Sequence, residues 1–439
     1  MFESRCEFSV PIKFSHFANL QKVSFVLQTR SHDENHYRFS KQHLISVFLK
    51  NLKNRFFDWA KAPIIDDRKL VRICAFLNVF CLSWLSLTGK GYADSELIDL
   101  EEMAQDFVLE TKKIEIPGYP FAFNPSIIRW QGRLIMSFRV IDDPKASFNS
   151  WIGLIFLDDN FNPIGEPQKL IMRPADSTVP CRAEDARFLI AGDRLWMIYS
   201  DNAEPKISRG GYRVYIATVI ETDGHFSLEG IECLSRFEGE NQNFREKNWV
   251  PFEYEGQLLL AYSLKPHRIF IPMAETGECW TVATTPTLVD WAWGDLRGGT
   301  PAIFDENIGE YLAFFHSSKN MATVHSDGAV VSHYFIGAYT FSRHPPFNIT
   351  RISQEPIVGR GFYRGTIYKP YWKPVRVVFP CGIIVEQDYI WITYGRQDHE
   401  IWITKLDKKR LLNHLTPVKL PKENHDRPTM YAKSPRDTK

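Results

Sequence analysis

The sequence has almost no net charge. It carries 53 Lys and Arg against 52 Asp and Glu in 439 residues, which leaves a formal charge of +1 at neutral pH, and the two signs are interspersed. Attraction to nucleic acid or to an anionic membrane surface requires a clustered excess of Lys and Arg. We therefore predict no nucleic-acid partner.

The sequence also lacks the spacings that hold metals or build a disulfide framework. Its 7 Cys include no CxxC pair and have no His nearby at zinc-ligand spacing. A glycine-rich phosphate loop and a Ser-His-Asp order are missing as well. We expect no metal and no cofactor, and interpret the thiols as small buried side chains.

Aromatic residues, in contrast, are abundant. They make up 14% of the chain, with 12 Trp, 17 Tyr and 32 Phe. Such a composition is typical of stacked strands, or of sites where sugars lie against ring faces. It favours a β-rich fold.

An apolar run without charge, residues 73–87, lies well inside the chain. It follows a basic stretch at 68–72 and precedes Gly91-Tyr92-Ala93. A basic region, an apolar region of about 7–15 residues and small residues together form a secretory signal. Three interpretations of residues 70–93 stay open: a signal peptide, a membrane anchor, and a buried helix. The run is shorter than the roughly 20 apolar residues that span a bilayer comfortably.

The compartment depends on this segment. Residues 1–69 are an N-terminal extension, and one hypothesis is that the working protein starts near Leu70 without them. An active signal would export the protein to the periplasm or the medium, whereas otherwise we expect it in the cytoplasm. A membrane is a partner only if residues 73–87 remain as an uncleaved anchor. Residues 421–439 have few apolar side chains and predict a disordered tail. The sequence does not determine the oligomeric state.

From residue 120 onward one pattern repeats five times. Each copy is an apolar strand, a turn, and a second apolar strand that ends in an aromatic residue. The turn residues, of types that tolerate positive φ, are Gly132, Gly192, Gly256, Gly309 and Asp388. The aromatic ends are Phe138, Tyr199, Tyr262, Phe315 and Tyr394. Third strands are expected at 151–157, 212–220, 279–284, 333–341 and 400–406.

The repeat predicts the fold class. A unit of three or four antiparallel strands cannot bury both of its faces alone, so five units stacked radially form a propeller. We predict an all-β, five-bladed β-propeller over residues 118–420, preceded by the poorly defined N-terminal extension with its apolar segment. A β-sandwich with coincidental hairpins is the alternative.

Polar residues interrupt the apolar pattern at two repeat positions. In a propeller the innermost strands line the central channel, so these residues are expected to converge on one funnel. Fourteen residues before the aromatic end, three copies carry Asn124, Asp185 and Asn248. Directly after the aromatic end stand Arg139, His316 and, in the last copy after Gly395, the run Arg396-Gln397-Asp398.

The expected funnel combines an acid with cations. Asp185, with Glu184 beside it, would face Arg139, Arg187, Lys247, His316 and Arg396. An acid among cations and aromatic rings suits a sugar-processing pocket: the acid protonates a leaving oxygen, and the cations hold an anion or developing negative charge. The alternative is a structural ion pair of Glu184 and Asp185 with Arg187 or Arg182.

The order of these motifs resembles glycoside hydrolase family 130, the β-mannoside phosphorylases and hydrolases, which are five-bladed propellers. The family's opening blade, NPA…YLLYR, resembles NPSIIRWQGRLIMSFRV, and its EDPR motif resembles AEDARF. Its PP…YHG element resembles GGTPAIF…YLAFFHSS, and its last blade, VFPCG…YYGAAD, resembles VVFPCG…YIWITYGRQD. The similarity covers about residues 118–407.

The resemblance implies inverting phosphorolysis or hydrolysis of a β-mannoside oligosaccharide, with inorganic phosphate as a candidate co-substrate. It implies that Asp185 is the proton donor, with Glu184 as its neighbour. Substrate or phosphate contacts are expected from the remaining polar residues, which are Asn124, Arg139, Arg187, Lys247, Asn248, His316, Arg396 and Asp398. Ala186 departs from the motif's Pro, and Arg396 stands where the family has a small residue.

Two other functions stay open on the sequence. One is a glycosyltransferase that builds a mannose-containing glycan, since the same site can run in reverse. The other is a non-catalytic glycan-binding propeller.

Overall fold

The computed structural model describes residues 2–12, 21–31, 97–143, 149–173, 177–205, 207–209, 211–365 and 374–419. The chain divides into two compact units, Met1–Glu96 and Leu97–Lys439. In the first unit, β1 (Phe2–Ile12) and β2 (Gln21–Ser31) form an antiparallel hairpin. The signal-like segment 70–93 and the predicted tail 421–439 lie outside the described residues. Within the described ranges no helix combines the length and the apolar character needed to cross a bilayer.

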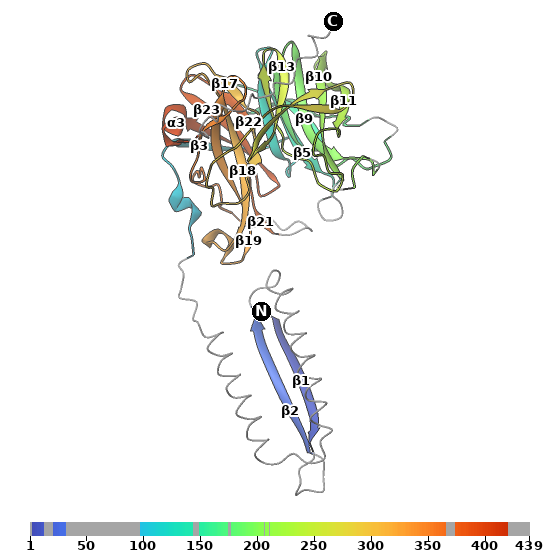
Figure 1. The fold of residues 1–439 in the computed structure, drawn as a ribbon, viewed down its shortest axis with the longest axis vertical. Helices are drawn as coiled ribbons and strands as arrows, with labels where there is room; N and C mark the ends of the chain where they lie inside the picture. Colours follow the sequence, from blue (N-terminus) through green and yellow to red (C-terminus); the bar gives the residue numbers. More distant parts are fainter. Residues whose placement is uncertain are drawn as a thin grey trace, which may run out of the picture. The chain divides into compact units, whose positions relative to one another are not determined.

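The second unit is an all-β, propeller-like fold with almost no helix (Figure 1). Four of its sheets have four antiparallel strands each. The first is β4 (Phe123–Trp130), β5 (Arg133–Ile141), β6 (Ser150–Leu157) and β7 (Pro163–Lys169). The second is β8 (Glu184–Ala191), β9 (Arg194–Asn202), β10 (Tyr212–Thr222) and β11 (His225–Leu234). The third is β12 (Val250–Tyr254), β13 (Gln257–Leu264), β14 (His267–Met273) and β15 (Glu278–Thr285). The last is β22 (Val378–Val385), β23 (Tyr389–Arg396), β24 (Glu400–Asp407) and β3 (Val108–Ile114).

The fourth repeat builds a different, seven-stranded sheet. Its long central strands are β18 (Glu310–Met321) and β19 (Val331–Ser342). The shorter members are β16 (Arg297–Gly298), β17 (Ile303–Asp305), β20 (Ile349–Ile352), β21 (Val375–Arg376) and β25 (Thr416–Pro417). The prediction of five like blades is therefore corrected to four regular blades and one larger sheet. Two features account for the difference. Pro301, which has no N–H to donate, lies in the break between β16 and β17. In addition, β19 is long enough to pair with β21 in parallel.

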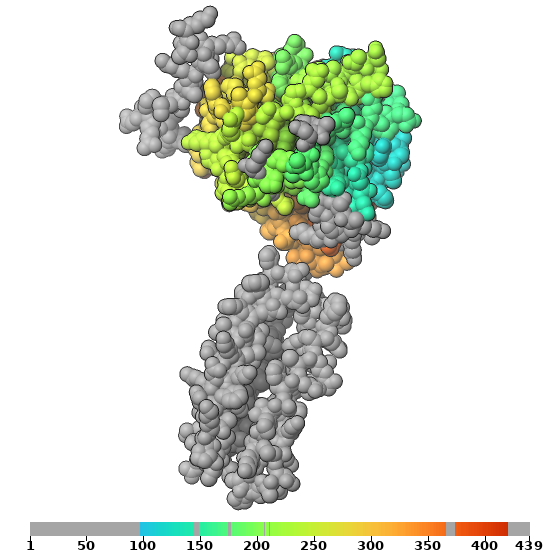
Figure 2. All heavy atoms as spheres, turned by 90° about the vertical axis from the view of Figure 1, so that its right-hand side faces the viewer, coloured from blue at the N-terminus to red at the C-terminus, as the bar shows by residue number. Residues whose placement is uncertain are grey.

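The first strands of the repeats surround one another. Strand β4 contacts β8, β8 contacts β12, β12 contacts β17, β17 contacts β22, and β22 contacts β4 again. Of the polar candidates, Asn124, Glu184, Asp185 and Arg187 lie on these innermost strands, and Lys247 and Asn248 lie just before β12. Arg139, His316 and Arg396 lie on the second strands of their repeats. In the space-filling view the sequence colours follow one another across the visible face, from cyan through green to yellow (Figure 2).

Strand β3 closes the last blade. It pairs antiparallel with β24, with Ile114 opposite Ile401. The sheet therefore includes residues that precede the predicted start of the propeller at 118. The two strands are separated by most of the chain, so a pattern of local periodicity could not pair them.

In the third repeat the expected third strand is corrected. Residues 279–284 fall in β15, which is the fourth strand, and the third strand is β14. Strand β14 follows Pro266 and contains Pro272, residues that usually mark the end of a strand rather than its interior. The other expected third strands fall in β6, β10, β19 and β24.

Short segments complete the fold, and apolar clusters hold neighbouring sheets together. The helical segments are the 3-10 helices η1 (Leu100–Met103) and η2 (Val324–Ser326) and the helix α3 (Lys408–His414). Between the first two blades, Ile135 and Ile152 pack with Phe188 and Met197. Because the apolar faces of the sheets pack against one another, polar side chains lie at the inner ends of the first strands.

Candidate functional site

The three polar residues that share a repeat position also share an unusual backbone. Asn124, Asp185 and Asn248 all have positive φ, at 48°, 56° and 62°. Asn and Asp are the side chains that accept this left-handed conformation most readily. At Asn124 and Asp185 the pairing with the second strand slips by one residue, which is a β-bulge. Such bulges redirect side chains, and strained backbone of this kind is concentrated at functional sites.

Asp185 is held from two sides. Its Oδ1 accepts a hydrogen bond of 2.7 Å from Nδ2 of Asn124, and its backbone carbonyl accepts one of 2.7 Å from Nη1 of Arg187. Arg187 is 1% exposed, and its Nη2 donates to Oδ1 of Asn248 at 3.1 Å while its Nε donates to the carbonyl of Gly299. One buried guanidinium thus connects the first strand of the second blade, at Asp185, with the segment before β12 and with the segment between β16 and β17.

Glu184 binds two cations. Its Oε2 lies 2.9 Å from Nη1 of Arg139, and its Oε1 contacts Nζ of Lys247. Burial lowers the pKa of Arg139, but Glu184 and Asp185 more than compensate, so its pKa lies above the ordinary value. Lys247 also lies 4.1 Å from the ring centroid of Tyr212, in a cation–π contact. We call Asp185, Glu184, Arg139, Arg187 and Lys247 the acid–cation cluster.

His316 adds no positive charge to this cluster. Burial lowers the pKa of His316 to about 3. Its Nδ1 is 2.8 Å from the carbonyl of Gly298, and because a carbonyl only accepts, Nδ1 carries the proton and Nε2 is left as an acceptor. The ring is parallel to that of Tyr334, at 5.9 Å, and edge-on to Phe379, at 4.6 Å. The expectation of a cation at this position is corrected to a neutral imidazole.

Arg396 and Asp398 take different places. Nε of Arg396 lies 2.6 Å from Oε2 of Glu400, and its Nη1 donates to the carbonyl of Gly361 at 2.7 Å. These contacts tie Arg396 to Glu400 rather than to Asp185. Asp398 is half-buried. This burial, together with the negative charges of Asp185 and Glu184, raises the pKa of Asp398 to about 6, although the charge of Arg139 acts in the opposite direction. Asp398 is therefore within electrostatic reach of the acid–cation cluster.

The structure thus brings together most of the predicted residues, either in direct contact or within the range of electrostatic interaction. The sequence interpretation missed Tyr212, Tyr334 and Phe379, together with the carbonyls of Gly298 and Gly299. The three rings look like ordinary strand aromatics. The one available signal was that Phe379 directly precedes Pro380, which shares the repeat position of Asp185.

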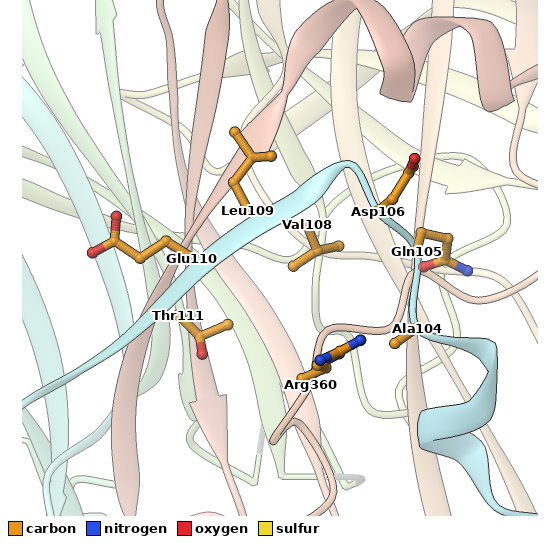
Figure 3. Close-up of a pocket in the computed structure, with 8 residues that line it drawn as sticks. All are labelled: Ala104, Gln105, Asp106, Val108, Leu109, Glu110, Thr111 and Arg360. Carbon is orange, nitrogen blue, oxygen red and sulfur yellow. The ribbon is translucent and has the colours of Figure 1, made fainter.

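A surface hollow of about 360 Å³ lies where β3 begins (Figure 3). All of its lining residues except Arg360 come from residues 104–111. No member of the acid–cation cluster lines it, so we do not assign it to the site. Among the described residues, no group of three or more His, Cys, Asp or Glu is placed to hold a metal ion.

The buried histidines predict a fall in stability in acid. Burial lowers the pKa of His316 to about 3 and those of His267 and His333 to about 4, whereas an unfolded His titrates near 6.5. Below about pH 6.5 the unfolded chain therefore binds protons that the folded chain does not, and the free energy of unfolding decreases. We expect a loss of about 2 kcal/mol per His between pH 7.5 and 5, measured by urea unfolding.

A matched variant separates this effect from that of the carboxylates. His267→Gln removes one titrating group, so its unfolding free energy should fall less steeply over the same pH interval. An equal slope in the variant and the parent chain would contradict the assignment of His267.

Comparison with known proteins identifies a family whose sequence profile matches this chain. The sequence profile described as β-1,4-mannooligosaccharide phosphorylase, glycoside hydrolase family 130, matches residues 95–416. No curated protein sequence matches the chain.

Among solved structures, three similar ones illustrate the range. The β-1,2-mannobiose phosphorylase from Listeria innocua is 17% identical, with 69% of this chain and 92% of that chain covered and a TM-score of 0.43. A glycosyl hydrolase from Bacteroides ovatus is 16% identical, with 69% and 87% covered and a TM-score of 0.47. A mannose phosphorylase from Leishmania mexicana, solved with phosphate ion, is 12% identical, with 73% and 94% covered and a TM-score of 0.47. Because the profile match spans most of the chain and contains the acid–cation cluster, the chain belongs to glycoside hydrolase family 130.

Proposed function

We propose that this protein is an inverting phosphorylase of β-mannosidic oligosaccharides, with Asp185 as its general acid. The observation that carries the proposal is the surroundings of Asp185. Oδ1 of Asp185 is occupied by Asn124, and the described residues give Oδ2 no hydrogen-bond partner. Oδ2 is therefore the oxygen from which a proton can be given to a substrate.

The proposed step is a single displacement. A phosphate oxygen attacks the anomeric carbon while the bond from that carbon to the glycosidic oxygen breaks, and Asp185 transfers its proton to the leaving oxygen. Inversion converts a β-mannoside into an α-mannosyl phosphate and a shortened sugar. Asp185 ends as a carboxylate and must be reprotonated before the next turnover.

Charge balance favours phosphate over water as the nucleophile. In the reactive form Asp185 carries its proton, so the cluster then holds three cations, Arg139, Arg187 and Lys247, against one remaining carboxylate, Glu184, which contacts Arg139 and Lys247. Uncompensated cations in a buried site are costly, and an anionic co-substrate offsets that cost. Lys247 is the most exposed of the three, with 28% of its side chain accessible, so it is the cation best placed to meet an incoming phosphate.

We also propose that the seven-stranded sheet serves as the fifth blade. Its strand β17 completes the ring of first strands between β12 and β22. The site would then lie at the centre of a five-membered ring, with Asn124, Asp185 and Asn248 on three successive blades.

The test is a product assay with the purified full-length chain. β-Linked manno-oligosaccharides are incubated with and without inorganic phosphate, and mannose 1-phosphate and free mannose are measured separately. We expect mannose 1-phosphate, formed only when phosphate is present. Free mannose at a rate indifferent to phosphate would make the protein a hydrolase. No product in either form would overturn the proposal in favour of a transferase or a glycan-binding protein.

A further inference from the structure

Gly395 occupies a regularly paired position one residue before the end of a strand. It lies in β23, opposite Phe379 of β22 and Ile401 of β24. It is not among the glycines with positive φ. Backbone conformation therefore does not require glycine here, and a small side chain would fit the strand itself.

The side chain of Asn124 takes the space that a side chain at Gly395 would need. A Cβ atom on Gly395 would overlap Oδ1 of Asn124 and would lie 3.0 Å from its Cγ and 2.9 Å from its backbone nitrogen. Oδ1 of Asn124 is buried and has no hydrogen-bond partner among the described residues. The carboxamide is thus located by two things: its contact with Gly395 and the bond from its Nδ2 to Asp185.

Two other strand glycines show that this arrangement is specific. Gly153 and Gly337 also lie in regular strands, and a Cβ on either would overlap the aromatic ring of Phe138 or Phe315 on the neighbouring strand. Those glycines make room for a core ring. Gly395 instead makes room for a polar group that is hydrogen-bonded to the carboxyl of Asp185.

The hydrogen bond from Asn124 decides which oxygen of Asp185 carries a proton. Oδ1 accepts from Nδ2 of Asn124, so in the acid form the proton resides on Oδ2. A displaced carboxamide would allow the carboxyl to rotate. The proton would then no longer point in one direction.

We propose that Gly395 is a positioning residue for Asp185 and that it acts through Asn124. Because Gly395 has no side chain, the carboxamide of Asn124 packs directly against it. The carboxamide in turn orients the carboxyl group of Asp185. This inference rests on the proposed role of Asp185 as general acid. It extends that role to the last blade, from which no described residue donates a hydrogen bond to the carboxyl.

The experiment compares two donors in the full-length chain with phosphate present. Manno-oligosaccharides need a proton on the leaving oxygen, whereas 4-nitrophenyl β-mannoside releases a phenolate that needs little protonation. For Gly395→Ala we expect kcat on manno-oligosaccharide to fall by about 10- to 100-fold, since misplacing a reacting group by about 1 Å costs on that order. The rate on the nitrophenyl donor should fall by less than about 3-fold, because the acid contributes little there.

A double-mutant cycle tests the route through Asn124. Asn124→Ala removes the carboxamide and should cause the same selective loss. In the Asn124→Ala background, Gly395→Ala should leave the ratio of the two donor rates unchanged, since the carboxamide that it displaces is gone. Its remaining contact, with the backbone nitrogen of residue 124, should lower the melting temperature only. If Gly395→Ala alone does not fold, the double variant still decides. A double variant that folds and matches Asn124→Ala supports the contact, and one that remains unfolded overturns it.

Gly153→Ala is the matched control. It introduces a clash of similar kind against Phe138, so it should lower the melting temperature but leave the ratio of the two donor rates unchanged. The inference would be overturned if Gly395→Ala lowered the rates on both donors equally. It would also be overturned if Gly395→Ala still lowered the manno-oligosaccharide rate selectively in the Asn124→Ala background. If Asp185→Asn itself produces no loss that depends on the leaving group, the assignment of the acid fails instead.

Discussion

Asp185→Asn is expected to lower the turnover of manno-oligosaccharides by about 10²- to 10⁴-fold, the contribution typical of a general acid. An Asn side chain has nearly the same shape and can still accept the hydrogen bond from Asn124 at its Oδ1. It has no acidic proton to give to the leaving oxygen. The fold should therefore persist while the chemistry is lost, and kcat with phosphate together with the melting temperature measures both.

A second buried carboxylate provides the control for Asp185. Asp201 is fully buried and lies 2.7 Å from Nη2 of Arg173. Among the described residues, none of its hydrogen bonds or ion pairs involves the acid–cation cluster. Asp201→Asn should lower stability, because Arg173 loses its counter-ion, yet leave the turnover of folded protein near that of the parent chain. A wild-type rate in Asp185→Asn would remove Asp185 from the mechanism.

Glu184→Gln is expected to cost about 3–5 kcal/mol of stability, the range for breaking a buried ion pair by removal of one partner. Glu184 has 5% of its side chain exposed and Arg139 has 10%. Without Glu184, the charges of Arg139 and Lys247 lose their counter-ion. Because Lys247 is 28% exposed and can reach solvent, we expect the lower end of that range, measured by urea unfolding.

Phosphate should offset part of this loss. An anion that binds between Arg139 and Lys247 replaces the missing carboxylate, and a ligand that binds the folded state raises its stability. Added phosphate should therefore raise the melting temperature of Glu184→Gln more than that of the parent chain. The turnover of the variant should also fall, since Arg139 and Lys247 are no longer held in place.

Glu221 supplies the comparison for Glu184. Glu221 pairs with Arg133 at 2.7 Å, and 43% of the Arg133 side chain is exposed. A pair of this kind is worth about 0–1 kcal/mol. If Glu184→Gln destabilises the protein no more than Glu221→Gln does, Glu184 is not the counter-ion that Arg139 and Lys247 require.

Local chemistry allowed much of the fold and several site residues to be predicted. The paired apolar strands, the glycine turns and the aromatic ends each depend on neighbours within about twenty residues, and the hairpins are found where they were expected. Gly132 and Gly256 have φ of 76° and 77°, as tight turns demand. Asn124, Asp185 and Asn248 were singled out because they interrupt an apolar pattern, and they share one left-handed backbone position in the structure.

The remaining features could not be predicted because their causes are not local. The pairing of β3 with β24 and the enlargement of the fourth sheet depend on segments far apart in the chain. The neutral state of His316 comes from burial, which a residue type does not reveal. Arg396 is two residues from Asp398 in the sequence but is bound by Glu400 on the next strand.

By itself, the sequence determined the repeating strand units, the all-β class and the family resemblance, and it singled out a candidate acid, because periodicity, turn residues and motif order are properties of the chain. Only the tertiary structure decided which sheet differs from the others, which cations bind Glu184, and that Asn124 lies between Gly395 and Asp185. Those features arise where the first strands of different sheets meet. Distances across that ring are set by the packing of all the sheets together rather than by any one segment.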